Sequence, residues 1–418
     1  MHESLLDMLR CPYCGTRLEL ANNDAVVRIG DELDSGVLGC QCCAFPIVAG
    51  IPVLVTNAVT GAAIRALEAG RHDEALTGLL GLDTPRASRM QALLADKATT
   101  FQEAIEVLSP DPEGTYFVYR FSDPTFRVAE ALVIAADEAT GQASKPRLDL
   151  CGGSGHLTRV LSERPRRSDS PQPDPIVADL HFWKLWLATR FTAPNCAAVC
   201  CDAEAPLPFR PDLFSLVVLA DAFPYIWNKR LCADEMLRVA DPNGVVLMPH
   251  LHSALGENMS AGDTLTPSAY RDLFATWQPR LFSDTTLLDE LLDHHHLDLT
   301  TPRSPTSLDG EPSLALLATR GDTIRGVHTI PPPLTVTGQL KVNPLYRATS
   351  RPGGARLTLQ FPSQEYEQEF GTCRRYLPET VDIPTDVSKT MTPNTLGDRY
   401  AELRRRRVIL DLPLRYCP

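Results

Sequence analysis

The middle of the chain alternates short apolar runs with amphipathic helical segments. Five runs rich in Leu, Val, Ile and Ala read RLDL, PIVAD, AAVCC, LFSLVVL and GVVLMPHL. Stretches such as HLTRVL and ADEMLRVA lie between them and keep their apolar positions at helical spacing. This alternation predicts an α/β fold with a mostly parallel sheet, right-handed crossovers and a ligand site at the carboxyl ends of the strands.

The segments on either side show other patterns. Residues 58–109 keep apolar positions at helical spacing between Gly and Pro residues, which predicts helices. Residues 114–127 gather aromatic side chains around Arg120, and such a segment is either core or a lid over a ligand. Beyond residue 321 the apolar runs are short and interrupted by Pro and Gly, so we expect a small β-rich extension there.

Composition narrows the possible classes of function. The 418 residues are 44% hydrophobic and 22% charged, which is typical of a folded protein of several domains. The formal net charge of −12 disfavours nucleic acid as a partner, and the basic run at 404–407 fits a solvated end of a short final helix. No run has the length of a membrane helix, and Asp7 and Arg10 stand where a signal peptide is apolar, so we expect a cytoplasmic protein without a membrane anchor.

Five of the twelve cysteines fall within the first 43 residues. Cys11 with Cys14 and Cys40 with Cys43 form two C-x-x-C pairs, and four such thiolates make a closed, structural zinc site. Cys42 is left as a spare thiol. A redox or merely buried thiol cluster is the alternative. The spacer between the pairs, AVVRIGDELDSGVLGC, predicts a β-hairpin.

The residues around these pairs resemble a known module. LLDMLRCPYC before the first pair and CAFPIVAGIPVLV around and after the second are similar to the Trm112-like zinc module, over about residues 1–56. The resemblance implies a short helix before the first pair and a hairpin after the second. It also implies an accessory role, because modules of that family bind or stabilise methyltransferases.

A glycine turn follows the first apolar run of the middle region. The run ends at Asp149, Gly152, Gly153 and Gly155 follow, and an amphipathic helix begins at once. Glycines let the backbone approach a ligand closely, and the first N–H groups of the helix face that ligand. Asp179 ends the second run, where a ribose-binding carboxylate is expected, and a charged, Pro-rich insertion before that run lengthens the spacing. A dinucleotide-dependent dehydrogenase would use the same first turn.

The order of the later segments resembles class I S-adenosylmethionine-dependent methyltransferases over about residues 129–321. LDLCGGSGH, the Asp after PIVA, CDAEAPLPF and the run from FSLVVLADAF to EMLRVADPNG are similar to their successive motifs. The resemblance implies a seven-stranded Rossmann-like sheet and S-adenosylmethionine as cofactor. It implies that Asp149 and the glycine turn face the methionine part, that Asp179 takes the ribose hydroxyls, and that Asp202 and Ala203 contact the adenine. Asp202 could instead simply form a turn.

Further cofactor contacts are expected from residues beside these motifs, namely Leu180, Ala220, Tyr119 and Arg120. The acceptor should bind over the fourth and fifth strand ends, where Asp221 and Tyr225 follow one run and His250 and His252 end the next. Histidine is suited to take a proton near neutral pH, although a structural histidine is the commoner case. His294–His296 fit a helix end that complements the helix dipole.

Together these patterns predict a zinc-ribbon domain (1–57), a helical connector or lid (58–128), a methyltransferase domain (129–325) and a β-rich extension (326–418). The leading hypothesis is an S-adenosylmethionine-dependent methyltransferase acting on a small molecule or on a carrier-bound or peptide-bound natural-product intermediate. Methylation of tRNA or rRNA is the second hypothesis, and a non-catalytic scaffold that binds the cofactor is the third. A homodimer is possible on this sequence.

Overall fold

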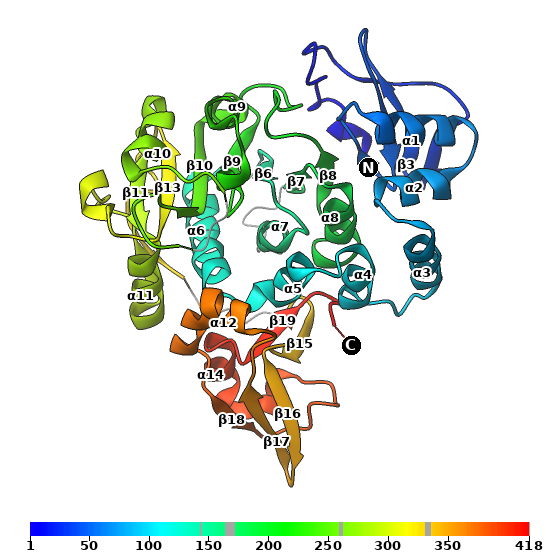
Figure 1. The fold of residues 1–418 in the computed structure, drawn as a ribbon. Coiled ribbons are helices and arrows are strands. Elements are labelled where there is room, and N and C mark those ends of the chain that lie inside the picture. Colours follow the sequence, from blue (N-terminus) through cyan, green and yellow to red (C-terminus); the bar gives the residue numbers. More distant parts are fainter. Residues whose placement is uncertain (143, 164–171, 259–261, 331–335, 418) are drawn as a thin grey trace.

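The computed structural model describes residues 1–142, 144–163, 172–258, 262–330 and 336–417. Its centre is a seven-stranded sheet in the order β11-β13-β10-β9-β6-β7-β8 (Figure 1). β13 is antiparallel to both neighbours, and the pairs within β10-β9-β6-β7-β8 are parallel. The strands are β6 (Arg147–Leu150), β7 (Ile176–Asp179), β8 (Ala197–Cys200), β9 (Phe214–Val218), β10 (Ala240–His252), β11 (Arg280–Ser283) and β13 (Ser313–Thr319). The expectation of a seven-stranded, mostly parallel methyltransferase sheet is confirmed.

Helices cover both faces of this sheet (Figure 1). They are α6 (Pro124–Thr140), α7 (His156–Ser162), α8 (Phe182–Leu187), α9 (Lys229–Val239), α10 (Pro267–Leu273) and α11 (Asp284–His294). α6, α7, α8 and α11 share one apolar core, and α9 and α10 belong to the other. The bounds of α6 follow from its sequence, because Asp123 caps its first turn, Pro124 opens it and Gly141 ends it in the left-handed conformation. His294 ends α11 and His295 is its C-cap, so a helix end lies there as expected, whereas His296 begins the next strand.

The N-terminal module is a small curled sheet (blue in Figure 1). Its strands are β1 (Glu19–Leu20), β2 (Val27–Ile29), β3 (Glu32–Gly39), β4 (Ala44–Val48) and β5 (Ile51–Pro52). The hairpin predicted between the cysteine pairs is β2–β3, and the one after the second pair is β4–β5. The Leu54 N–H donates to the Cys200 carbonyl at 2.7 Å, and Val53 bridges Cys200 in parallel. The module therefore continues the central sheet beyond its edge strand β8.

Helices predicted between residues 58 and 109 are confirmed. They are α1 (Ala58–Glu68), α2 (His72–Leu79), α3 (Thr84–Ala95) and α4 (Phe101–Leu108). α5 (Pro112–Tyr119) follows and carries the aromatic segment toward the central sheet. Asn57 and Thr100 begin α1 and α4 with reciprocal capping boxes, which explains where these helices start.

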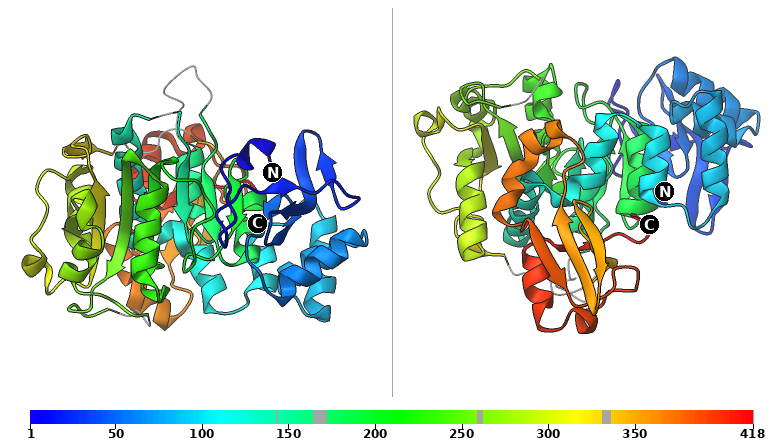
Figure 2. Two further views of the ribbon diagram at one scale, coloured as in Figure 1. Left: turned by 90° about the horizontal axis from the view of Figure 1, so that it is seen from above. Right: turned by 60° about the horizontal axis from the view of Figure 1, so that its bottom comes forward.

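The C-terminal part has its own apolar core and packs against α5 and the segment before α6 (Figures 1 and 2). Its elements are β15 (Gln339–Val342), β16 (Tyr346–Arg351), β17 (Gly354–Leu359), β18 (Thr380–Ile383), β19 (Ile409–Leu412), α12 (Gln364–Phe370), α13 (Pro393–Leu396) and α14 (Tyr400–Arg405), while β12 (His296–Asp298) pairs with β14 (Val327–Thr329) before it. The Tyr376 hydroxyl donates to the Ser122 carbonyl at 2.8 Å, and Ser122 also bonds the Asn343 side chain at 2.9 Å. Strands occur here as expected, together with three short helices.

The basic run at 404–407 differs in part from the sequence-based expectation. α14 does end within it, and Arg405 is exposed, but Arg404 is buried. Arg407 pairs with Glu130 of α6 and donates to the Phe121 carbonyl at 2.9 Å, so α6 and the segment before it hold this side chain inside. Most of the charged insertion before β7 lies outside the described residues. No helix in the described part of the chain is long and apolar enough to cross a membrane.

Candidate functional site

The glycine turn after β6 is sterically required. A Cβ on Gly152 would lie 2.6 Å from Asp149 Cγ and 2.8 Å from Val177 Cγ2, so a side chain does not fit there. Gly153 and Gly155 have φ of 55° and 80°, which L residues rarely adopt. Gly155 is the N-cap of α7, and the turn therefore brings the start of this helix to the carboxyl end of β6.

Two aspartates hold this turn in place. Asp179, at the end of β7, accepts hydrogen bonds from Gly153 N at 3.0 Å and from His181 N at 2.8 Å. Burial opposes its ionisation, but the hydrogen bonds from His181 and the Lys184 charge prevail and lower the pKa of Asp179. Asp149 accepts from the Thr158 hydroxyl at 2.6 Å, and burial together with the Asp179 charge raises its pKa to about 6.

The other expected cofactor residues lie along the same edge. Asp202 follows β8 and accepts from Glu204 N at 2.8 Å through Oδ1, so it forms a turn whatever else it binds. Ala203 is buried and Ala220 half-buried, whereas Leu180 is 47% exposed. These positions are compatible with a cofactor laid across the ends of β6, β7 and β8, and the contacts themselves stay a prediction.

The aromatic segment of α5 covers the glycine turn. A Cβ on Gly153 would meet the Phe117 ring at 3.1 Å, so Phe117 lies directly over the turn. Arg120 is buried, donates to Asp123 at 2.8 Å and lies over the Tyr116 ring at 5.1 Å. Tyr119 packs its ring 5.5 Å from that of Tyr366 in α12. The segment is thus both packed core and cover of the site.

Asp221, shortly after β9, forms a cluster with His250 and His252 in the last residues of β10. One ligand atom from each lies within 4.8 Å of the others, and the two imidazole centroids are 4.7 Å apart. His252 Nε2 is 3.6 Å from Asp221 Oδ1. Asp221 and His250 both adopt positive φ, 61° and 57°, and such strain in non-glycine residues concentrates at functional sites. We therefore call Asp221, His250 and His252 the polar cluster.

Two further residues orient the polar cluster. The Tyr116 hydroxyl donates to Asp221 Oδ2 at 3.0 Å, and Asp284 Oδ2 lies 2.9 Å from His250 Nδ1. Burial alone would raise the pKa of Asp221, but His252, His250 and Arg120 lower it to about 2. Burial alone would lower the pKa of His250, but the Asp284 and Asp221 carboxylates raise it. The carboxylate of Asp221 is therefore ionised at neutral pH.

Sequence reasoning did not identify Tyr116 or Asp284 as site residues. Asp284 opens α11 and follows β11, which is remote in sequence from β10 and meets it only through β13. Tyr116 belongs to the aromatic segment 114–127, for which the sequence predicts a core or lid role only. Tyr225, which sequence reasoning did include, is 59% exposed on a short 3₁₀ turn, Phe223–Tyr225, and its catalytic role stays a prediction.

The thiol cluster of the N-terminal module differs in one member from the expectation. Four sulfur atoms lie within 4.8 Å of one another, and they belong to Cys11, Cys14, Cys40 and Cys42. Cys42 Sγ is 3.7 Å from Cys11 Sγ and 3.6 Å from Cys40 Sγ. Cys43, expected as the fourth ligand, is not in this group. Its carbonyl accepts from Cys40 N, its N–H donates to Cys40 Sγ, and it directly precedes strand β4.

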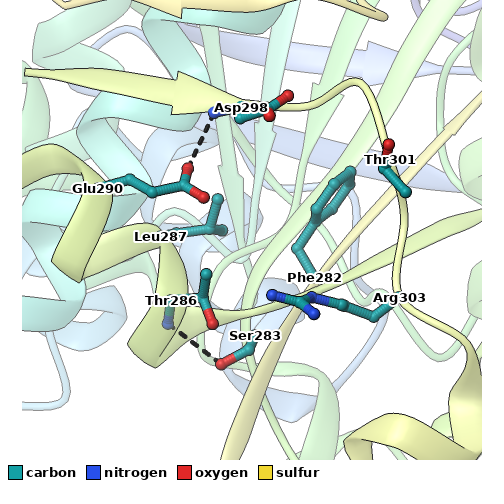
Figure 3. A pocket seen from close by; sticks show the side chains of 8 residues that line it. All are labelled: Phe282, Ser283, Thr286, Leu287, Glu290, Asp298, Thr301 and Arg303. Carbon is teal, nitrogen blue, oxygen red and sulfur yellow. Dashed lines mark hydrogen bonds between the residues drawn. The ribbon is translucent and has the colours of Figure 1, made fainter. Parts of the chain in front are cut away.

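A separate hollow of about 250 Å³ lies between β11, α11 and the segment after β12 (Figure 3). Glu290 and Ser283 on its wall accept from the backbone N–H groups of Asp298 and Thr286. None of its lining residues belongs to the glycine turn or the polar cluster. It is therefore not the site described above.

Comparisons with known proteins agree with the fold. Residues 148–248 match the family model described as methyltransferase domain. No curated protein sequence matches the chain. Solved structures match with probability 1.00 but low TM-scores.

Three such structures show the range. The YcgJ protein from Bacillus subtilis is 16% identical, with 44% of this chain and 99% of that chain covered and a TM-score of 0.29. A complex of the Haloferax volcanii Trm112 methyltransferase activator with a putative methyltransferase is 16% identical. The match covers 44% of this chain and 88% of that chain, with a TM-score of 0.31. A putative sarcosine dimethylglycine methyltransferase from Galdieria sulphuraria is 15% identical, with 46% of this chain and 86% of that chain covered and a TM-score of 0.33. No substrate follows from similarities of this size. The sheet order and the family match together show that the chain contains a class I S-adenosylmethionine-dependent methyltransferase domain.

Proposed function

We propose that this enzyme transfers the methyl group of S-adenosylmethionine to a small molecule, or to a natural-product intermediate carried on a protein or peptide. The observation that carries the proposal is the placement of the glycine turn, Asp179 and the polar cluster along one edge of the sheet. The cofactor supplies both electrophile and leaving group, so the protein has to align the acceptor and help remove its proton.

The cofactor is proposed to lie along this edge. Asp179 would accept from the ribose hydroxyls, and Asp202 and Ala203 would contact the adenine. Arg120, which is buried in the segment that covers the glycine turn, would bind the carboxylate of the methionine part. This places the methyl group toward the polar cluster, whose side chains would bind the acceptor and favour loss of its proton.

A methyl acceptor of modest size fits the surroundings of the polar cluster better than RNA does. The net charge of −12 opposes binding of a phosphate backbone. The C-terminal part packs Phe370 against the Tyr116 ring at 5.9 Å and so narrows the approach to Asp221. Methylation of tRNA or rRNA is an alternative. A scaffold that only binds the cofactor is opposed by the polar cluster, because such a scaffold would not need these acceptor-side groups.

The thiol cluster is proposed to hold a structural zinc ion. Tetrahedral thiolates at about 2.3 Å from zinc are separated by about 3.8 Å. Three of the six sulfur separations among Cys11, Cys14, Cys40 and Cys42 are 3.6–3.7 Å, close to that value, and all six are within 4.8 Å. Four protein ligands leave no position for a substrate, so the ion would brace the module that extends the sheet at β8.

Isothermal titration with S-adenosylmethionine tests the proposal. The wild-type protein should bind it, and Asp179→Ala should weaken binding by about 1.5 to 3 kcal/mol, the value of a hydrogen bond to a charged group. Asp398→Ala, an exposed aspartate of the C-terminal part, is the matched control and should bind as the wild type does. Absence of binding by the wild type would reject both the enzyme and the scaffold hypotheses.

A further inference from the structure

We infer that the polar cluster, Asp221, His250 and His252, holds a divalent transition-metal cation that binds the methyl acceptor through oxygen. The inference deepens the proposed function and rests on it for the identity of the acceptor site. Two imidazoles and one carboxylate form a donor set suited to Mn²⁺, Fe²⁺, Co²⁺ or Zn²⁺, and three protein ligands leave positions open for substrate.

The separations within the polar cluster suit shared coordination better than a hydrogen bond. His252 Nε2 and Asp221 Oδ1 are 3.6 Å apart, which is too long for a good hydrogen bond. Two ligand atoms at about 2.1 Å from one ion are about 3.0 Å apart at octahedral angles and about 3.4 Å apart at tetrahedral angles. The three ligand atoms lie within 4.8 Å of one another, so small side-chain movements bring them onto a common ion.

Asp221 and His250 each use one polar atom to bind a neighbouring side chain, and this leaves the second polar atom of each for a metal. Tyr116 donates to Asp221 Oδ2, which leaves Oδ1 on the side of His252. Asp284 holds His250 at Nδ1, which leaves Nε2 for a metal. A carboxylate or hydroxyl partner behind the ligand is the usual second layer of a metal site, where it fixes the tautomer and the ring orientation.

The local charge also favours a cation. The carboxylates of Asp221 and Asp284 lie within reach of the histidines. Arg120 is the nearby positive group and is engaged with Asp123 at 2.8 Å. Within the described residues, His252 Nδ1 is buried without a hydrogen-bond partner, and Nε2 is the ring nitrogen that faces Asp221.

A cation here determines the chemistry of the acceptor. A substrate hydroxyl bound to the ion loses its proton to solvent water more easily, as metal-bound water does. The oxygen lone pair then forms a bond to the methyl carbon, the sulfur–methyl bond breaks, and its electron pair returns to sulfur to give neutral S-adenosylhomocysteine. The open positions favour an acceptor that presents a second oxygen next to the reacting hydroxyl, because both oxygens can bind the same ion.

Titration of the full-length protein, carrying no more than one zinc ion per chain for the thiol cluster, with Mn²⁺, followed by electron paramagnetic resonance of the free ion, tests the inference. Mn²⁺ prefers oxygen and nitrogen over thiolates, so the thiol cluster does not compete for it. We expect one Mn²⁺ per chain, binding at least tenfold weaker in His252→Ala, and binding weaker by about 10- to 100-fold in Asp284→Asn, which keeps the shape of the side chain.

The matched control is the double variant His294→Ala/His296→Ala, which removes two other neighbouring imidazoles, 5.4 Å apart, and should leave Mn²⁺ binding unchanged. Retained binding of S-adenosylmethionine shows that each variant is folded. Failure of the wild type to bind Mn²⁺, or equal binding by His252→Ala, overturns the inference. A protein that binds S-adenosylmethionine but no Mn²⁺ refutes the metal alone, and one that binds Mn²⁺ but no S-adenosylmethionine refutes the proposed function instead.

Discussion

Replacing Gly152 by alanine tests whether the glycine turn is a close-fitting cofactor cradle. The added Cβ would lie 2.6 Å from Asp149 Cγ and 2.8 Å from Val177 Cγ2, where ordinary contact begins at 3.4 Å. Asp149 cannot easily turn aside, because its Oδ2 accepts from Thr158 at 2.6 Å. The backbone therefore has to shift by several tenths of an ångström. Overpacking of this kind costs about 1–3 kcal/mol, which corresponds to about 5- to 150-fold weaker cofactor binding if the turn opens.

Isothermal titration of both forms with S-adenosylmethionine, beside thermal unfolding, measures this effect. Gly78→Ala is the matched control, because Gly78 lies in α2 with no atom within 4 Å of the added Cβ, and alanine favours a helix. Gly78→Ala should bind the cofactor normally and unfold at the same or a slightly higher temperature. Equal cofactor affinity in Gly152→Ala and Gly78→Ala would refute the claim that the glycine turn fits closely around the cofactor.

Three other predictions concern metal content, packing and pH. Cys42→Ser should lose bound zinc and unfold at lower temperature, whereas Cys43→Ser should keep its zinc; the opposite pattern in zinc content would restore Cys43 as the ligand. Tyr416→Phe should lose about 1–3 kcal/mol in urea unfolding, because its buried hydroxyl bonds His156 at 2.8 Å and a carbonyl at 2.7 Å, and an unchanged midpoint contradicts this. Burial raises the pKa of Asp149 to about 6, so its contribution to stability is full below about pH 4 and is lost as pH rises through 6. The wild type should then lose roughly 2–3 kcal/mol relative to Asp149→Asn between pH 4 and 7.5, and parallel pH profiles would exclude this.

The sequence predicted the parts of the site that depend on local pattern. The strand ends at Asp149 and Asp179, the glycines between them and both hairpins of the N-terminal module follow from periodicity and turn chemistry within short segments. The proximity of Asp221 to His250 and His252 was also predictable, because neighbouring parallel strands end at the same edge of a sheet.

Long-range packing decides the rest. Asp284 reaches His250 only because β11 is placed beyond β13, and no pattern near residue 284 indicates that. The choice between Cys42 and Cys43 depends on how the second cysteine pair enters the β4 hairpin, since adjacent residues point in different directions. Tyr416, next to the last residue described, reaches back to the helix after the glycine turn.

The two outer parts of the chain take different places around the site. The N-terminal module contacts β8 at the edge of the sheet, and this supports a bracing role for it. The C-terminal part instead meets α5 through Phe370 and Tyr366 and so lies next to the residues that orient Asp221. Related enzymes of this layout that methylate different acceptors should therefore differ more in the C-terminal part than in the N-terminal module.

A crystal structure of the protein with S-adenosylhomocysteine tests the central claim most directly. The account predicts ribose hydroxyls on Asp179, adenine beside Asp202, and the sulfur atom directed toward Asp221, His250 and His252. A cofactor whose sulfur points away from these three residues, or one bound in the hollow beside α11, would contradict the account.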